Sequence, residues 1–518
     1  MKKQTFFYFL LVILCLFFWS CPARPQIDYV TLNDSENFPE EAAFLRGLFE
    51  NSGISGLVPL PAGVAESAFP KAETLPEPAI IIDFHESLGK ASSVPDGSGG
   101  ILVSQVWLVP REDPLAGRSG TTLALCTGGE ETLIPLTELN PPYVTLRVDG
   151  FSVEDEDYPL VREARISIRA ANSQNRERTK REQKRVDEKI AALEGLLRDS
   201  PKPLVAEAPQ ILWVASAGDL MLDRGASDIL FREGPEGIFG GTAAFLAGSD
   251  LALVNLEGAV SSRGEKVKKS FNFRFDPKVA PALRDSGIDA VLLANNHAFD
   301  YGETAFLDTL THLQEANIGI LGAGLSDIAA ALPWTFQKGG TTVQVFGLAS
   351  YPRERNGWDG LNVAAEPEKP GLLHAGKGGG DRLKANFIRE KADALDIVLF
   401  HGGEEWSRRP NTATRQLYTD LIQQGADLVI GSHPHVVQGF EWIEGKPVFW
   451  SLGNYVFGGM DNTEGGEEGL FIRLGFIGSR MIYLDPYPLT LTHTRTSLAP
   501  PEKLKNFYTL SKAFTSGK

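Results

Sequence analysis

The sequence has few cysteines and few histidines for its length. It contains three cysteines and eight histidines among 518 residues. Cys15 and Cys21 lie within or directly after an apolar N-terminal run, so only Cys126 remains in the body of the chain if Cys21 is modified. In that case an intramolecular disulfide is excluded, and Cys126 is predicted to be a small buried apolar residue.

The chain also lacks an excess of positive charge. Its formal net charge of −16 argues against general nucleic-acid binding, because a polyanion would be repelled. A small anionic substrate held by a local basic patch is still compatible with this charge. The hydrophobic content of 42% and the charged content of 22% are typical of a globular protein with large cores, and the length predicts two or three domains.

The apolar run near the N-terminus, Thr5–Trp19, is shorter than the roughly 18–20 residues that span a bilayer. Lys2 and Lys3 precede the run, and Cys21 follows it at once. This arrangement resembles a bacterial lipoprotein signal, in which the cysteine is lipidated. Residues 1–21 are therefore predicted to be a lipoprotein-type signal peptide, with an uncleaved anchor as the alternative. In both cases we expect an exported, membrane-anchored protein at the bacterial cell envelope.

Changes in composition divide the rest of the chain. Residues 22–170 mix short apolar runs with stretches rich in Pro, Gly and Ser, which predicts a smaller N-terminal α/β or mostly β domain without an assigned role. Residues 171–204 alternate charges of both signs on strong helix formers, which predicts a charged linker helix. Residues 205–500 are predicted to be the main domain, and residues 501–518 a C-terminal tail.

The main domain alternates short apolar strands with helical stretches. Strands that are apolar throughout indicate sheets covered on both faces. Since these strands are too many for one small sheet, we expect two stacked sheets between helices. The predicted strands are Ile211–Ala215, Leu251–Val254, Ala290–Ala294, Ile318–Leu321, Val343–Leu348, Ile397–Phe400, Leu428–Ile430 and Pro447–Ser451.

Polar residues follow most of these strands, in turns that contain glycine or other short side chains. Such turns bring short side chains toward a common centre at the strand ends. Carboxylates, an amide and several imidazoles form a mixed set that suits Mn, Fe or Zn rather than a thiolate cluster. Six candidate ligands exceed the three of a catalytic zinc and suit two metal ions about 3.5–4 Å apart. The motifs are Gly218-Asp219, Asn255-Leu-Glu257, Asn295-Asn296-His297, His401-Gly-Gly-Glu404-Glu405, Gly431-Ser-His433-Pro-His435 and Gly453-Asn454-Tyr455.

The order of these motifs between residues 211 and 460 resembles the CapA family. That family is associated with poly-γ-glutamate capsule biosynthesis and belongs to the calcineurin-like metallophosphoesterase superfamily. The resemblance implies a four-layer αββα sandwich with a dinuclear metal site at the strand ends. It also implies that His297 is the catalytic general acid. The implied ligands are Asp219 and His435 for the first ion, Glu257 as the bridge, and Asn296, His401 and His433 for the second ion.

Three departures from the family pattern affect this site. Met221 stands where the superfamily has a histidine, so the first ion loses a ligand. Glu257 is one methylene longer than the usual bridging aspartate. Gly402 stands where the CapA pattern usually has Trp, and Trp406 replaces the usual Tyr, which changes the wall of the pocket.

The segment 261–274 is locally basic in an acidic chain and follows Glu257. Arg263 and Lys266 of this segment, together with Asn454, are predicted to bind substrate. The alternative is a solvated loop whose charge has no role.

Three functions agree with these observations. The first is a membrane-tethered dinuclear metallohydrolase that acts in the synthesis, anchoring or processing of a capsule or envelope polymer such as poly-γ-glutamate. The second is a phosphoesterase on phosphorylated or nucleotide substrates, and the third is a non-catalytic polymer export or assembly factor. The expected partners are an anionic envelope polymer or a phosphorylated small molecule, the membrane through a lipid anchor, and a capsule-synthesis complex, without nucleic acid.

Overall fold

The computed structural model describes most of the chain between residues 28 and 515. Cys21 and the predicted signal peptide lie outside the described residues. Among the helices that are described, none combines the length and the hydropathy required to cross a bilayer. The described residues are 28–33, 39–51, 57–58, 79–89, 101–116, 118, 120–121, 126, 130–148, 152–155, 158, 160–170, 179–200, 209–354, 357–388, 394–460 and 463–515.

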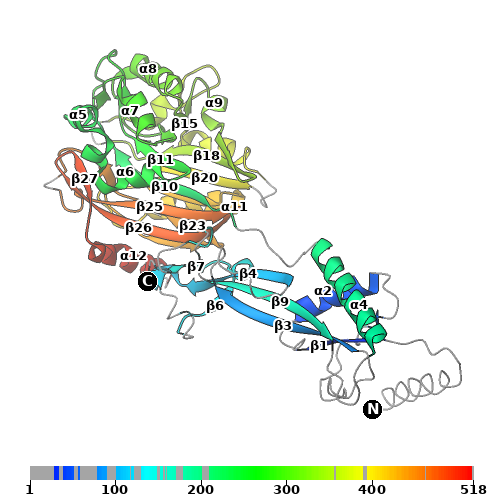
Figure 1. Cartoon of the computed structure of the whole chain (residues 1–518). Coiled ribbons are helices and arrows are strands. Elements are labelled where there is room, and N and C mark those ends of the chain that lie inside the picture. The colour runs from blue at the N-terminus through cyan, green and yellow to red at the C-terminus, as the bar shows by residue number, and fades with distance from the viewer. Residues whose placement is uncertain are drawn as a thin grey trace. The chain divides into compact units, whose positions relative to one another are not determined.

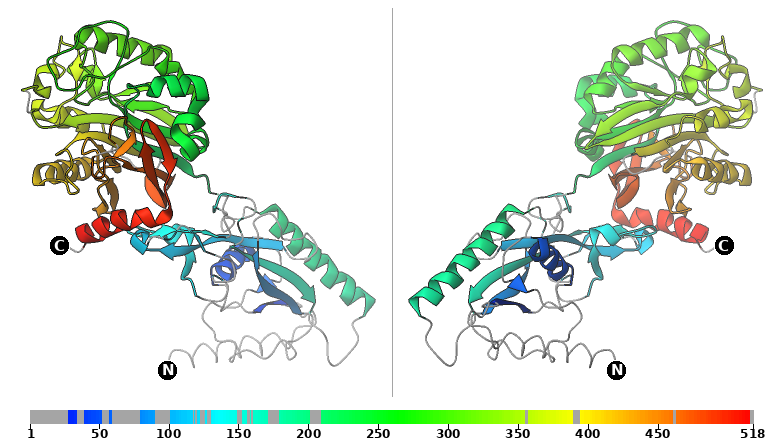
Figure 2. Two further views of the ribbon diagram at one scale, coloured as in Figure 1. Left: turned by 90° about the vertical axis from the view of Figure 1, so that its left-hand side faces the viewer. Right: turned by 90° about the vertical axis from the view of Figure 1, so that its right-hand side faces the viewer.

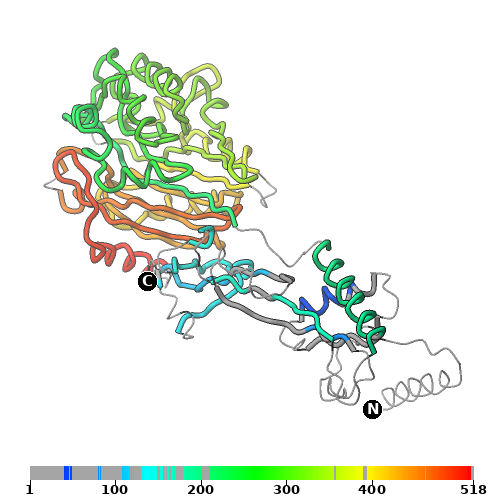
Figure 3. Tube along the Cα trace, viewed as in Figure 1, coloured from blue at the N-terminus to red at the C-terminus, as the bar shows by residue number. Residues whose placement is uncertain are grey.

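The chain divides into two compact units. The first contains residues 1–108 and 155–208, and the second contains residues 109–154 and 209–518. Within the second unit, the described trace from residue 209 to residue 515 has only short gaps (Figure 3). The sequence-based division grouped residues 22–170 instead, because the strand-like runs of that region continue with no composition change near residue 109.

The first unit is a mixed sheet with two helices. Its strands have the order β2-β1-β3-β9-β4, with β1 parallel to β2 and β3, and β9 antiparallel to β3 and β4. Helices α2 and α4 pack on this sheet through an apolar cluster that includes Leu45, Ile82 and Leu193 (Figure 1). The elements are β1 (Asp28–Asn33), α2 (Pro39–Asn51), β2 (Leu57–Val58), β3 (Ala79–Gly89), β4 (Ile101–Glu112), β9 (Val161–Ala170) and α4 (Lys180–Asp199).

Helix α4 coincides with the charged segment that the sequence predicted to be a linker helix. Its exposed side carries charged pairs such as Lys184 with Glu188, whose side chains are 78% and 65% exposed. Its apolar residues Leu193 and Leu197 lie near its end and are buried against the sheet. The charge pattern therefore marks the solvent face of a helix that packs within the first unit.

The second unit contains two larger sheets. The eight-stranded sheet has the order β15-β14-β11-β10-β25-β26-β27, with β24 paired to β10, and its first four strands are parallel. The six-stranded sheet has the order β17-β18-β20-β21-β23-β22, with parallel pairing from β18 to β23. The strands are β10 (Leu212–Leu220), β11 (Leu251–Leu256), β14 (Ala290–Leu292), β15 (Gly319–Leu321), β24 (Asn454–Val456), β25 (Glu468–Ile477), β26 (Arg480–Thr492), β27 (Arg495–Leu498), β17 (Trp334–Lys338), β18 (Thr341–Ser350), β20 (Ala394–Gly402), β21 (Leu428–Ser432), β22 (Phe440–Ile443) and β23 (Lys446–Phe449).

Short strand pairs flank these sheets. They are β5 (Gly120–Thr121) with β8 (Arg147–Val148), β12 (Ala259–Val260) with β13 (Arg274–Phe275), and β16 (Ala323–Gly324) with β19 (Gly371–Leu372), while β6 (Leu133–Pro135) and β7 (Val144–Thr145) join the sheet of β4.

Apolar residues cover both faces of each large sheet. One cluster joins the two sheets, with Val214 and Leu253 on one side and Ile397 and Ile430 on the other. A second cluster lies between the eight-stranded sheet and helices α5, α6, α7 and α8, and a third between the six-stranded sheet and α9, α10 and α11 (Figure 2). These helices are α5 (Ala226–Phe239), α6 (Ala243–Ala247), α7 (Val279–Asp285), α8 (Gly302–Glu315), α9 (Asp327–Ala331), α10 (Gly379–Lys384) and α11 (Thr412–Gln424).

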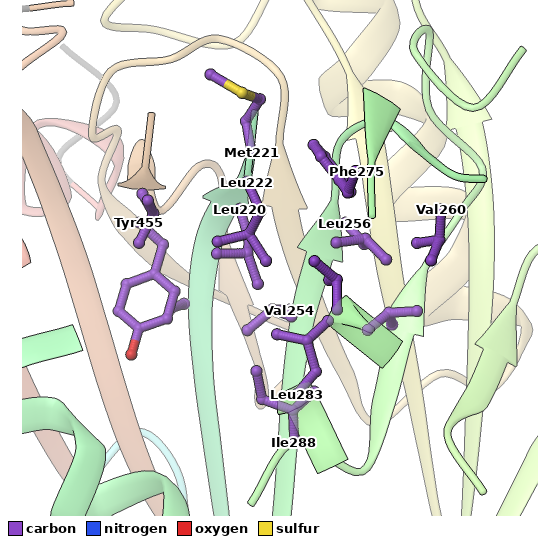
Figure 4. Close-up of a cluster of buried hydrophobic side chains, with 14 of the residues drawn as sticks. Leu220, Met221, Leu222, Val254, Leu256, Val260, Phe275, Leu283, Ile288 and Tyr455 are labelled. Carbon is purple, nitrogen blue, oxygen red and sulfur yellow. The ribbon is translucent and has the colours of Figure 1, made fainter. Parts of the chain in front are cut away.

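The second cluster covers the helix-facing side of the eight-stranded sheet, opposite the side that faces the other sheet. Leu220, Val254 and Leu256 of β10 and β11 belong to one buried cluster with Leu283 and Ile288, and Val254 lies next to these two residues (Figure 4). Each buried side chain of this size stabilises the fold by about 1.5–3 kcal/mol. Every residue of β10 and β11 is buried, so the mixed α/β architecture predicted from fully apolar strands is observed.

The C-terminal residues form a helix. Helix α12 (Leu504–Thr515) packs beside β22, where the Ser511 hydroxyl accepts a hydrogen bond of 2.8 Å from the backbone N–H of Phe440. Gly439 provides the space for this contact, because a Cβ there would lie 2.7 Å from Phe514. The segment that the sequence predicted as a tail is thus part of the second unit.

The described part of residues 109–154 packs on the rest of the second unit through a largely buried polar cluster. Arg147 forms an ion pair of 2.7 Å with Asp485 of β26 and lies over the ring of Trp213 at 5.1 Å. The Trp213 indole N–H donates to Glu154 at 2.6 Å, and the Val153 N–H donates to the Tyr483 hydroxyl at 3.0 Å. Burial raises the pKa of Asp485, so this carboxylate depends on Arg147 for its charge partner.

We expect Arg147→Ala to lower the free energy of unfolding of the second unit by about 3 kcal/mol, because it removes the ion-pair partner of the buried Asp485. Urea denaturation of the full chain measures this loss. Arg118→Ala is the control, since Arg118 is 40% exposed and its ion pairs contribute little. Equal losses in the two variants would contradict the role of residues 109–154 as part of this unit.

Candidate metal centre

The six residues predicted as ligands and His297, the predicted general acid, lie at one edge of the two sheets. Parallel strands direct their carboxyl ends to the same edge, so side chains after different strands meet there. All seven residues are buried, with exposed fractions from 0% to 7%. They are Asp219 in β10, Glu257 after β11, Asn296 and His297 after β14, His401 in β20, and His433 and His435 after β21.

Three of these residues form a nitrogen and oxygen group. The Nε2 atom of His401 lies 3.0 Å from Oδ1 of Asn296 and 3.1 Å from Nδ1 of His433. The Ser432 hydroxyl donates to the carbonyl of Phe400, so it accepts at 3.1 Å from Nδ1 of His401. Nδ1 of His401 therefore carries the proton, and the lone pair of Nε2 is directed at Asn296 and His433. A metal ion requires a histidine in this tautomer.

Two carboxylates form the other side of the site. Oδ2 of Asp219 lies 3.1 Å from Nδ1 of His435, and Oε1 of Glu257 lies 3.8 Å from Nε2 of His435. One ligand atom from each of Asp219, Glu257 and His401 lies within 4.8 Å of the others. The structure therefore brings all six predicted ligands together.

Asn255 connects the two carboxylates. Its side-chain amide donates to Asp219 at 2.8 Å and to Glu257 at 3.1 Å. The amide of Asn295 donates in turn to Oδ1 of Asn255 at 3.0 Å, which fixes the orientation of Asn255. Asn255 and Asn295 stand in the predicted motifs, but a residue that holds ligands has no signature of its own in one sequence.

Two buried atoms of the group have no hydrogen-bond partner among the described residues. They are Oε1 of Glu257 and Nε2 of His433. Oε1 of Glu257 lies 3.6 Å from Nε2 of His297 and 3.8 Å from Nε2 of His435 without a hydrogen bond to either, and a buried oxygen in this position is costly unless a cation binds it. The donor set and these two atoms fit a divalent metal ion.

The charges of the histidines separate into two groups. Burial lowers the pKa of His401 well below its usual range and that of His433 to about 3, so both rings are neutral. Burial also acts on His435, but Glu257 and Asp219 outweigh it and raise its pKa to about 10. Burial and the neighbouring Asp219 raise the pKa of Glu257 well above its usual range. The neutral rings can bind metal directly, while His435 acts as the charge partner of the carboxylates.

The turn that carries His433 and His435 has an unusual backbone. Both residues have positive φ, at 96° and 58°, which costs about 1–3 kcal/mol at each non-glycine residue. Asn454 of β24 holds this turn, since its amide donates to the carbonyls of His435 and Gly466 and its oxygen lies 2.9 Å from Nδ1 of His435. Asn454, predicted as a substrate contact, is 0% exposed and lies against His435.

His297, the predicted general acid, lies beside Glu257. Its Nδ1 atom is 2.6 Å from Oδ2 of Asp300, and its Nε2 atom is 3.6 Å from Oε1 of Glu257. Its ring packs on Phe273 with centroids 4.4 Å apart. Burial lowers the pKa of His297, although Asp300 opposes this shift.

The structure also places the departures from the family pattern. Met221 is fully buried in the apolar cluster and takes no part in the ligand group. A Cβ at Gly402 would lie 2.1 Å from the carbonyl oxygen of Ser350, so a larger residue requires the neighbouring strand to move. Trp406 is 39% exposed, and its ring centroid is 5.6 Å from that of His435. Trp406 thus forms part of the site's rim.

The predicted substrate contacts of the basic segment lie on the surface. The guanidinium of Arg263 pairs with Asp308 of α8, and this hydrogen-bonded pair lowers the pKa of Asp308 to about 2. Lys266 is exposed on the same segment. The buried cation beside the ligand group is Lys269, which the sequence did not single out because it stands among several basic residues.

These features define the second unit as a mixed α/β protein with a buried cluster of carboxylate, amide and imidazole groups that can hold metal. Residues 213–459 match the family model described as "Bacterial capsule synthesis protein PGA_cap". The predicted resemblance to the CapA family is confirmed for this part of the chain.

Curated relatives show the same similarity. The chain is 30% identical over 252 residues to "PGA biosynthesis protein CapA" of Bacillus subtilis, covering 48% of this chain and 63% of the relative. It is 29% identical over 261 residues to "Capsule biosynthesis protein CapA" of Bacillus anthracis, covering 48% and 60%. A "Probable polyglutamine synthesis accessory protein" of Mycobacterium tuberculosis is 27% identical over 321 residues, covering 54% and 81%. The chain thus spans less than two thirds of the two CapA proteins.

We expect Asn255→Ala to lower the affinity for Mn²⁺ by about 10–100-fold, because removal of a group that orients ligands typically has this effect. Competition with a chelator gives the affinities.

His433→Ala should lower the bound metal per chain, as measured by elemental analysis after dialysis. His312→Ala is the control, since His312 lies on α8 and is not one of the ligands. Unchanged metal content in His433→Ala would contradict the assignment.

Proposed function

We propose that the CapA-family domain is a metal-dependent hydrolase that acts on a capsule or envelope polymer such as poly-γ-glutamate. The observation that carries this proposal is the meeting of six buried residues with nitrogen and oxygen ligand atoms, among which Oε1 of Glu257 and Nε2 of His433 have no hydrogen bond. Two facing sheets between layers of helices support a four-layer αββα fold of the metallophosphoesterase type.

The ligand group would hold two divalent ions, with Mn, Fe and Zn as the candidates. When bound, such ions polarise a carbonyl or phosphoryl oxygen and activate water. The two candidate sites differ in their ligands, since one side offers neutral rings and an amide and the other offers carboxylates. The ligands would be Asp219, Glu257 and His435 on the carboxylate side and Asn296, His401 and His433 on the other.

His297 would supply the proton for the leaving group. Asp300 accepts from Nδ1 of His297, so the opposite ring atom, Nε2, is the one that faces Glu257 and the ligand group. Phe273 shields the ring on one face. In the tautomer protonated at Nδ1, Nε2 is free to take up a second proton from solvent. The imidazolium formed in this way would then donate that proton to a leaving group on the side of the site where a substrate would bind.

The proposed substrate is an anionic polymer because the relatives' names refer to PGA biosynthesis and capsule biosynthesis. The exposed Lys266 and the adjoining basic segment lie near Glu257 in the sequence and offer positive charge in an acidic chain. We further propose that the chain is exported and anchored through a lipid on Cys21, within a capsule-synthesis complex.

We expect His297→Ala to lower polymer cleavage by about 10²–10⁴-fold while leaving bound metal unchanged, because a general acid contributes this much to the rate. Cleavage of poly-γ-glutamate with Mn²⁺ present is followed by size-exclusion chromatography, with His312→Ala as the control. A panel of phosphate mono- and diesters is assayed in parallel. Turnover of phosphoesters alone would favour a phosphoesterase, and polymer binding without any turnover at full metal occupancy would exclude the hydrolase.

We expect Cys21→Ser to move the protein from the membrane fraction to the soluble fraction or to block its processing, because the acyl acceptor is lost. Metabolic labelling with a fatty-acid analogue tests this in a bacterial host, and Cys126→Ser is the matched control. Label that persists in Cys21→Ser would contradict the proposed anchor.

A further inference from the structure

Lys269 is buried beside the ligand group, with a side chain that is 1% exposed. A buried ammonium is costly unless charged and polar groups surround it. Its Nζ atom donates to Asp300 at 2.9 Å and to the carbonyl of Asn296 at 2.6 Å, and it lies 3.0 Å from Glu354. It also lies 5.5 Å from the ring centroid of Trp358. The side chain is therefore held by contacts on several sides.

The partners of Lys269 come from different parts of the second unit. Asn296 and Asp300 lie between β14 and α8, next to the eight-stranded sheet. Glu354 and Trp358 lie after β18, a strand of the six-stranded sheet. Lys269 thus connects segments that follow strands of both sheets, on the side of the unit where the ligand group lies.

Asp300 links Lys269 to His297. One oxygen of Asp300 accepts from Lys269, and the other accepts from the Phe273 N–H at 2.7 Å and from His297 at 2.6 Å. A carboxylate that accepts from three donors requires Nδ1 of His297 to carry its proton. The contact of Lys269 with the carbonyl of Asn296 fixes the peptide group that joins Asn296 to His297.

We propose that Lys269 is a positioning residue that holds Asp300 and thereby keeps His297 in the tautomer with Nδ1 protonated and Nε2 directed at the ligand group. Lys269 does not reach the reacting atoms in this proposal. Its importance for turnover rests on the proposed role of His297. A lysine that served only as an ion-pair partner could be lost without any change in the His297 ring.

The experiment compares the tautomer of His297 in variants of the full chain. Histidine rings are labelled with ¹⁵N, metal is removed with EDTA, and the His297 signals are assigned by their loss in His297→Ala. The expected result is a single Nδ1-protonated tautomer in the wild type and in Lys268→Met, the control at an exposed neighbour. Lys269→Met should show a mixture of tautomers, and Lys269→Arg should restore part of the wild-type signal.

Lys269→Met also leaves Asp300 and Glu354 without their cation. If this variant does not fold, the double variant Lys269→Met/Glu354→Gln is used in its place, because the second substitution removes the negative charge of Glu354 that the lost lysine had balanced. In the polymer assay, we expect kcat to fall about 100-fold with little change in KM or in bound metal, as for a misplaced catalytic group. A wild-type tautomer pattern in the folded Lys269→Met protein, or in the double variant, would overturn the proposal. Because the spectra need no substrate, an absence of turnover in the wild type would count against the hydrolase and leave this comparison intact.

Discussion

Two carboxylates, Asp219 and Glu257, are buried together, and the site is built around their need for cations. Their nearest neutral partner, Asn255, donates one hydrogen bond to each but cannot cancel their charge. His435 supplies one positive charge, and Oε1 of Glu257 has no hydrogen bond from any of the described residues. Since an uncompensated buried carboxylate is costly, a bound divalent cation would stabilise this arrangement. The neighbouring neutral rings of His401 and His433 match that requirement.

Close backbone contacts place these groups. A Cβ at Gly218 would lie 1.8 Å from the carbonyl oxygen of Gly453, so glycine is required where β10 passes the segment leading into β24. This approach sets Asp219 opposite Asn454, which holds His435. Gly431 has a similar role, since its Cβ would lie 2.1 Å from the carbonyl oxygen of Trp450. The glycines before Asp219 and His433 therefore serve strand packing as much as turn formation.

The sequence alone could predict which polar residues meet at the strand ends, but not the groups that hold them in place. Asp219, His401 and His433 stand at the ends of mainly apolar runs. Parallel strands place their carboxyl ends at one edge of a sheet, whatever side chains the strands carry. Lys269 could not be recognised, because its burial depends on Glu354, which lies far along the chain. The attachment of residues 109–154 was missed for the same reason, as Arg147 pairs with Asp485 more than three hundred residues away. Long-range pairs of single charged residues have no periodicity that a sequence displays.

Position 221 carries a methionine and not a histidine, so the carboxylate side of the site has one candidate ligand fewer. Met221 belongs to the apolar cluster beside β10, so this position contributes to core packing and offers no ligand to the site. The carboxylate side then has Asp219, Glu257 and a histidine whose proton those same carboxylates stabilise. A metal ion on that side competes with this proton, because metal binding requires a neutral imidazole. The other side has rings that burial already keeps neutral, so it can accept a metal ion without first releasing a proton.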